Sequence, residues 1–160
     1  MSSAPSSTLS FKDIDMTSTQ AYKKLLRLAL LAVCVVVANI RAEMVVVVTA
    51  NSPIHSLTRN EVAKIFLGKT RRFPDGSRAI PLNQSEGNAI RKAFYRQISG
   101  KSAAQVKAHW AKLIFTGRGQ PPKETSNDDK VKRLLNKNTA NIAYIDLASV
   151  DDSVKVVPLK

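Results

Sequence analysis

The chain has 160 residues, one cysteine and a formal net charge of +13 at pH 7. This length suits a single domain, and a lone cysteine excludes both an internal disulfide and a cysteine-rich metal framework. The basic excess persists over residues 43–160, with 20 Lys and Arg against 10 Asp and Glu, which favours a polyanionic partner or surface without specifying a fold.

Residues 1–42 are interpreted as an N-terminal extension followed by a secretory signal peptide. Basic residues precede the apolar run 28–38, and small residues follow it. The run is shorter than the roughly 20 residues that span a bilayer, so we expect export, with cleavage after Ala42, in preference to a retained anchor. Under this interpretation the signal segment is the only membrane contact. The residues ahead of Met16 do not resemble the start of a signal peptide, so translation could begin at either Met1 or Met16.

The first elements of the exported part have clear local signals. Residues 44–49 read MVVVVT, a β-branched run typical of a strand buried on both faces, as in parallel sheets. Thr58 and Glu61 form a capping box, which predicts a helix that ends at Gly68. Residues 79–82 indicate a second short strand.

Three further helices and two further strands are predicted in the rest of the chain. The helices start near Ser85, near Ser102 and at Ser126, and the strands cover 141–145 and 154–157. In the helix after Ser102, inward positions are expected to be Val106, Trp110, Leu113 and Ile114. Between this helix and the next, 116–122 is predicted to be an irregular loop.

Strands that alternate with helices predict an α/β fold with a mostly parallel sheet and flanking helices. Residues 43–160 are long enough to build one modest core. We therefore expect a single domain over this range.

Several runs together resemble one known family. They read SLTRNEVAKIFLGK, FPDGS, PLN, AFYRQISGKS, HWAKLIFTGRGQPP and NIAYID. The series is similar to the phosphate-binding proteins of ABC transporters, and above all to their short, single-lobe members, over about 46–157. The resemblance implies one lobe of a type II periplasmic binding protein, a phosphate ligand and a permease partner.

The same resemblance directs attention to the stretch that follows the second strand. In the family an Arg shortly precedes Ser-Gly-Thr at a helix start, and these residues help to hold phosphate. Here Asn83 stands near the position of the Arg, Glu86 precedes Gly87, and Asn88 replaces the Thr. The family's phosphate-binding residues therefore have counterparts in Gly87 and Ser85, but this sequence has no arginine at the matching position.

Two interpretations of this turn remain open. Free N–H groups at a helix N-terminus favour an anion, which makes Asn83, Gln84, Ser85, Gly87 and Asn88 candidate ligand-binding residues. In the alternative, Ser85 simply caps the helix and the neighbouring glutamate complements the helix dipole.

Other candidate binding residues lie elsewhere in the chain. Arg118, between two glycines, is suited to present its fork to an anion, or else it belongs to a solvated turn after a helix C-cap. Asn51 and Ser52 follow the first strand, where open α/β sheets usually bind ligands, although ordinary turn chemistry explains them equally well.

The remaining sequence features mainly argue against particular functions. His55 and His109 lack metal-site spacing, and no GxSxG, catalytic triad or paired carboxylate frame is recognisable, so we expect neither catalysis nor a cofactor. Export and the lack of interleaved aromatics argue against nucleic acid as a partner.

The leading hypothesis is an exported periplasmic solute-binding-like protein for phosphate or another small anion, with an ABC permease, another envelope protein or a second copy as partner. The alternative is a ligand-free protein-interaction or envelope-associated module that uses its basic surface.

Overall fold

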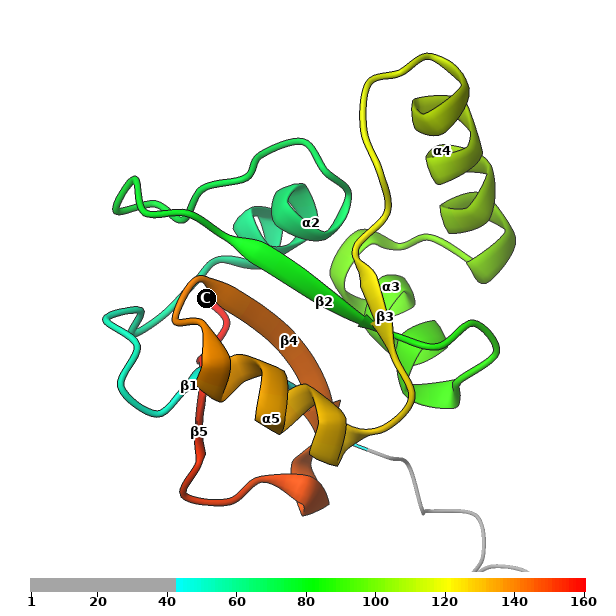
Figure 1. Cartoon of the computed structure of the whole chain (residues 1–160). Helices are drawn as coiled ribbons and strands as arrows, with labels where there is room; N and C mark the ends of the chain where they lie inside the picture. The colour runs from blue at the N-terminus through cyan, green and yellow to red at the C-terminus, as the bar shows by residue number, and fades with distance from the viewer. Residues whose placement is uncertain (1–42) are drawn as a thin grey trace, which may run out of the picture. The chain divides into compact units, whose positions relative to one another are not determined.

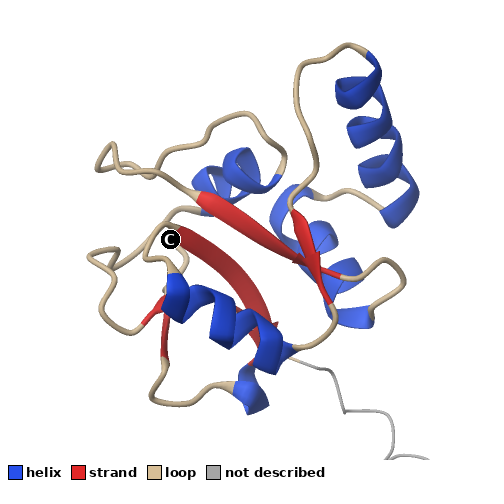
Figure 2. Ribbon diagram, in the orientation of Figure 1, coloured by secondary structure: helices blue, strands red, loops and turns tan. Residues whose placement is uncertain are grey.

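The computed structural model describes residues 43–160, so the expected signal segment and the cleavage site at Ala42 lie outside the described residues. In chain order the elements are β1 (Met44–Thr49), α2 (Arg59–Phe66), β2 (Ile80–Gln84), α3 (Ala89–Ser99), α4 (Ala103–Phe115), β3 (Lys123–Thr125), α5 (Asp128–Lys137), β4 (Asn141–Asp146), the 3-10 turn η2 (Leu147–Ser149) and β5 (Val154–Val156). Over the described range, no helix is long and apolar enough to cross a membrane. Figures 1 and 2 show the arrangement.

The five strands form one sheet in the order β3-β2-β4-β1-β5. β2 is parallel to both β3 and β4, whereas β1 is antiparallel to both β4 and β5. All the strands except β1 therefore point the same way, which confirms the predicted α/β fold with a mostly parallel sheet. β1 is buried along nearly its whole length, as expected, but its pairing is antiparallel, because an apolar run reports burial on both faces and not strand direction.

Helices cover both faces of the sheet. Alternate β1 side chains, Val46 and Val48, pack with residues of α2, α3 and α4 in one core cluster, while Val47 packs with residues of α5 in another. Figure 1 accordingly shows α5 in front of the sheet, with α2 and α3 behind it.

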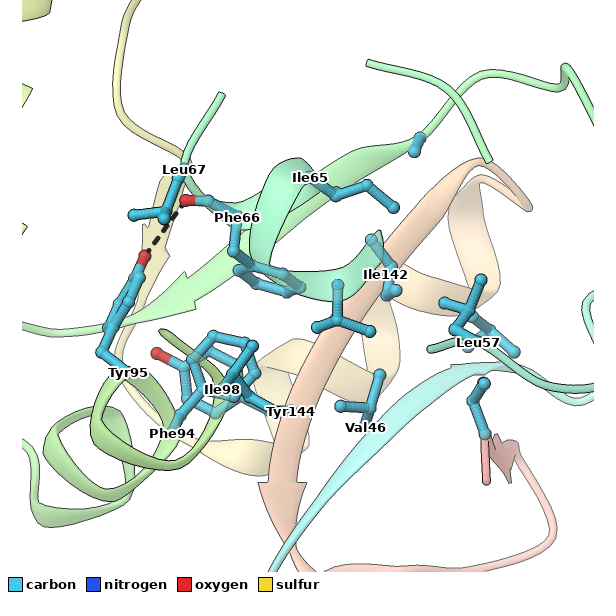
Figure 3. Packing of buried hydrophobic residues seen from close by; sticks show 14 of the residues in the cluster. Val46, Leu57, Ile65, Phe66, Leu67, Phe94, Tyr95, Ile98, Ile142 and Tyr144 are labelled. Atoms are coloured by element: carbon cyan, nitrogen blue, oxygen red, sulfur yellow. Dashed lines mark hydrogen bonds between the residues drawn. The ribbon is translucent and has the colours of Figure 1, made fainter. Parts of the chain in front are cut away.

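Aromatic rings form the centre of the larger cluster (Figure 3). The Phe94 ring stacks on Tyr144 with centroids 3.9 Å apart, and it meets Phe66 edge-on at 4.6 Å. Such ring pairs add roughly 0.5–1.5 kcal/mol each to the free energy of burial. They fix α2 and α3 against β4, and thereby place the start of α3 beside the end of β2.

Several predicted boundaries differ from the observed ones. The capping boxes at Thr58 and Ser102 are both present. The α3 helix begins later than predicted, at Ala89 with Asn88 as its N-cap, so the hypothesis that Ser85 caps this helix is wrong. Asn88 takes this role because β2 continues through Gln84 and a turn intervenes.

Two more corrections concern the segment from α4 to β3. Val106 and Trp110 are buried as predicted, but Ile114 is 55% exposed, because the last turn of α4 extends beyond the core that covers its first turns. The polar stretch Lys123–Thr125 forms β3, an edge strand that has no apolar alternation and was therefore not predicted.

Candidate functional site

The end of β2 is held in a buried polar network. Asn83 is fully buried. Its Nδ2 donates to the Tyr95 hydroxyl at 3.2 Å, and its Oδ1 accepts a hydrogen bond from the Tyr144 hydroxyl. Burial raises the pKa of Tyr95 to about 12 and raises the pKa of Tyr144 as well, so both phenols remain donors at neutral pH. The Tyr95 hydroxyl also lies 3.5 Å from the Phe66 carbonyl oxygen (Figure 3). The amide of Asn83 is thus engaged inside the core.

Gln84 joins β2 to the start of α5. Its backbone N–H donates to the Tyr144 hydroxyl at 3.2 Å, and its Nε2 donates to Oδ1 of Asp128 at 2.5 Å. Its Oε1 is buried and has no hydrogen-bond partner among residues 43–160. A buried acceptor without a donor costs about 1–3 kcal/mol, so a donor at this position would stabilise the folded protein.

The turn that follows β2 is tied to β3. The backbone N–H and the hydroxyl of Ser85 both donate to the carbonyl oxygen of Thr125, at 3.0 and 2.9 Å. Gly87 has a left-handed φ of +90°, which only glycine adopts readily. Asn88 then accepts from the Ile90 N–H at 2.8 Å and caps α3. Ser85 is therefore engaged within the protein, while Gly87 is exposed and Asn88 half-exposed at the surface.

Glu86 is not in the first turn of α3, because the helix begins three residues later. Its carboxylate lies 3.3 Å from Lys107 Nζ of α4, and both side chains are largely exposed. Such a surface pair contributes little to stability. Glu86 therefore does not complement the α3 dipole from the first turn, and the alternative interpretation of this glutamate is wrong.

A concavity at this edge of the sheet has a volume of about 320 Å³. It lies where β2, β3 and β4 end, between the N-termini of α3 and α5. Eight residues line it: Gln84, Asn88, Ile90, Ser126, Asn127, Asp128, Asp129 and Ser149. Two helix N-termini with their caps, Asn88 and Asn127, thus face one surface hollow, which we call the carboxyl-edge hollow.

Charge in this hollow is mixed. Each helix N-terminus carries roughly half a positive charge, but Asp128 and Asp129 stand in the first turn of α5. The Asp128 carboxylate is engaged on both oxygens, by Gln84 and by the Asp146 N–H at 3.2 Å. The Asp129 side chain is 72% exposed. No Lys or Arg lines the hollow.

Arg91 reaches the same turn from the other side. Its Nη1 donates to the Gln84 carbonyl oxygen at 2.8 Å and to Glu124 at 2.5 Å. The Arg91 side chain is only 15% exposed. In the sequence, the feature that could have indicated this contact is the position of Arg91 in the first turn of α3, seven residues after Gln84. Arg91 clamps the turn and does not line the carboxyl-edge hollow.

Asn51 and Ser52 lie at the other end of the strands from the carboxyl-edge hollow. Since β1 is antiparallel to β4, its carboxyl end meets the first residues of β4, far from Gln84. The Ser52 hydroxyl accepts from the Ile54 N–H at 3.3 Å, and the Ser52 carbonyl accepts from Lys155. The structure therefore does not bring Asn51 and Ser52 together with the turn after β2.

Arg118 lies apart from both regions, after the end of α4. Its backbone N–H donates to the Leu113 carbonyl at 2.9 Å, and Gly117 has a φ of +65°, as in a glycine-capped helix end. The guanidinium forms no salt bridge with the residues that the structure describes. Among residues 43–160, no cluster of three His, Cys, Asp or Glu side chains is arranged to hold a metal.

Known families and solved structures provide an independent comparison. No family model matches the chain. Among solved structures, a phosphate ABC transporter substrate-binding protein with bound phosphate from Clostridium perfringens matches with a TM-score of 0.57 and 22% identity, over 72% of this chain and 44% of that one. An ABC-type phosphate transport receptor from Vibrio cholerae matches with a TM-score of 0.56 and 20% identity, over 71% and 44%.

A third match, PstS from Borrelia burgdorferi, has a TM-score of 0.54 and 12% identity, over 73% of this chain and 47% of that chain. The chain thus spans less than half the length of each of these proteins. At these identities the likeness concerns the fold, which is that of one lobe of a phosphate ABC transporter substrate-binding protein.

Proposed function

We propose that this chain is a non-catalytic solute-binding protein that takes phosphate or another small oxyanion at the carboxyl-edge hollow. The proposal includes export to the periplasm through residues 1–42 and service to an ABC permease or another envelope protein. The observation that carries it is the meeting of two helix N-termini, with their caps Asn88 and Asn127, at one hollow. The fold shared with phosphate-transport proteins supports the same class of ligand.

The donor and acceptor pattern favours an oxyanion that keeps a proton. The first N–H groups of α3 are donors for its charged oxygens. The Asp129 carboxylate, which lines the hollow, is an acceptor, and it needs a hydroxyl opposite it. Hydrogen phosphate carries both kinds of group, whereas sulfate at neutral pH carries acceptors alone. We therefore expect phosphate to bind more tightly than sulfate.

The hollow is open on its outer side, so one lobe buries only part of a ligand. High-affinity small-molecule sites enclose most of the ligand surface. Tight binding would therefore require a second wall, from a partner protein or from a second copy of the chain. The lobe alone is expected to bind phosphate weakly, in the millimolar to high-micromolar range.

Isothermal titration calorimetry of the purified protein with phosphate and with sulfate tests the proposal. Ser126 lines the hollow and is exposed, so Ser126→Glu should abolish phosphate heat by adding a carboxylate, while Ser126→Gln, of matched size, should retain it. If neither heat nor a shift in Tm appears at millimolar phosphate, this chain is not a phosphate-binding protein.

One observation favours a second candidate function. Bulky apolar and cationic side chains are exposed together at the end of α4, as an envelope-associated module would require. This surface is separate from the carboxyl-edge hollow, so the two functions are compatible.

A further inference from the structure

The end of α4 exposes two large apolar side chains in succession. Phe115 is 93% exposed and Ile114 is 55% exposed. Earlier in the helix, Val106 and Trp110 face the core, so these turns are held by the protein and only the last one is free. In Figure 1 this end of α4 and the turn after it lie at the top of the view, away from the sheet.

Two arginines stand beside this apolar tip. A concavity of about 230 Å³ is lined by Arg71, Ile114, Gly117, Arg118, Gly119 and Gln120. Neither Arg71 nor Arg118 forms a salt bridge within residues 43–160. Two arginines without a salt bridge line one concavity, and an anion between them would be attracted by both charges.

The chemistry of the missing partner follows from both features. An arginine fork matches the oxygens of a phosphate group in bidentate fashion. The apolar side chains next to it call for a hydrocarbon environment a few ångströms away. A phospholipid in a bilayer presents this combination, with its phosphate at the surface and its acyl chains below.

We propose that the tip formed by Arg71, Ile114, Phe115 and Arg118 docks on a membrane surface that contains anionic phospholipid. Phe115 and Ile114 enter the headgroup region, while Arg71 and Arg118 hold lipid phosphates. The apolar area of two side chains is far below the roughly 1,200–2,000 Å² buried in a stable protein interface. At an anionic bilayer, by contrast, each cation near the surface contributes about 1 kcal/mol, and the buried apolar side chains add to this attraction. This inference does not depend on the proposed solute site.

Vesicle co-sedimentation tests the inference with the full chain. The vesicles contain phosphatidylcholine alone or phosphatidylcholine with phosphatidylglycerol. Because every variant keeps the same N-terminal segment, any contribution of that segment to binding cancels in the comparison. We expect binding to vesicles with phosphatidylglycerol and a steep loss of binding as salt rises.

Matched variants separate the tip from general charge. Phe115→Ser is compared with Leu147→Ser, since Leu147 is the exposed large apolar residue of the described range that lies outside the tip, at 42%. The double change R71Q/R118Q is compared with R133Q/K137Q, which removes the same charge from exposed positions of α5. Each tip variant should lower the vesicle partition coefficient roughly ten-fold, and each control less than two-fold.

Two results would overturn the inference. Equal losses in tip and control variants would mean that net charge alone attracts the protein to vesicles. Binding of inorganic phosphate that is abolished by R71Q/R118Q, without any binding to vesicles, would make the concavity a site for a soluble anion. All four variants change exposed side chains, and an unchanged Tm verifies that they fold.

Discussion

Gln84 and Asp128 are 44 residues apart in the chain, yet Nε2 of the first donates to Oδ1 of the second at 2.5 Å. This bond joins the end of β2 to the first turn of α5 and brings two helix N-termini to one hollow. It also holds an acidic residue where an anion would otherwise be most favoured. The same contact therefore builds the candidate site and limits its affinity.

Asp128→Ala should lower the free energy of unfolding by about 2–4 kcal/mol, because it removes a charged acceptor from both Gln84 and the Asp146 N–H. Asp129→Ala, in the same helical turn, is the control and should cost less than about 1 kcal/mol, since that side chain is 72% exposed. Urea unfolding measures both values. Equal losses would show that α5 needs the acidic turn in general and not the bond to Gln84.

Asp129→Asn should strengthen phosphate binding about two- to five-fold, because it removes a negative charge that lines the hollow while the amide oxygen still accepts from the phosphate hydroxyl. The control is Asp152→Asn, an exposed change outside the lining. Calorimetry at low ionic strength provides the measurement. An equal gain in both variants would assign the effect to net charge and place the anion elsewhere.

Gly68→Ala should be much more destabilising than Gly100→Ala, although φ is +69° at the first and +68° at the second. Each substitution places a side chain in the left-handed region, at about 1–2 kcal/mol. At Gly68 the new Cβ would also lie 2.7 Å from Trp110 Cη2, whereas at Gly100 it meets open space. Overpacking adds about 1–3 kcal/mol. Chemical denaturation should show this difference, and equal costs would mean that the Trp110 ring moves freely.

Stability should fall in acid partly through Asp151. The hydrogen bonds from Lys132 and Ser153 lower the pKa of Asp151 to about 2, compared with about 3.9 in an unfolded chain. A lowered pKa in the folded state stabilises the protein above pH ~4, and this contribution disappears as pH falls through ~2. Asp151→Asn should therefore lower Tm at pH 7, and the difference from the unmodified protein should shrink between pH ~4 and ~2.

Thermal unfolding followed across this pH range checks the prediction for Asp151. Asp152→Asn is the neighbouring control and should not change the shape of the pH dependence. A difference in Tm for Asp151→Asn that stays constant down to pH ~2 would exclude the ion pair with Lys132 as its cause.

Local chemistry made part of the fold predictable. The Thr58 and Ser102 capping boxes, the glycine at the end of α2 and the alternation of strands with helices were all identified correctly, because each depends on residues a few positions apart. The expectation that the turn after β2 binds a ligand stays a prediction. The expectation that Ser85 caps α3 failed, since the extent of β2 depends on its pairing with β3 and β4.

The sequence by itself determined the class of fold, most of the helices and the basic character of residues 43–160, because these follow from composition and short-range patterns. Only the tertiary structure decided that β1 runs antiparallel, that Asn83 serves the core through Tyr95 and Tyr144, and that the start of α5 stands beside the start of α3. Asn83 and Tyr144 are 61 residues apart. Hydrogen bonds over such separations depend on how strands pair and helices pack, which no local pattern records.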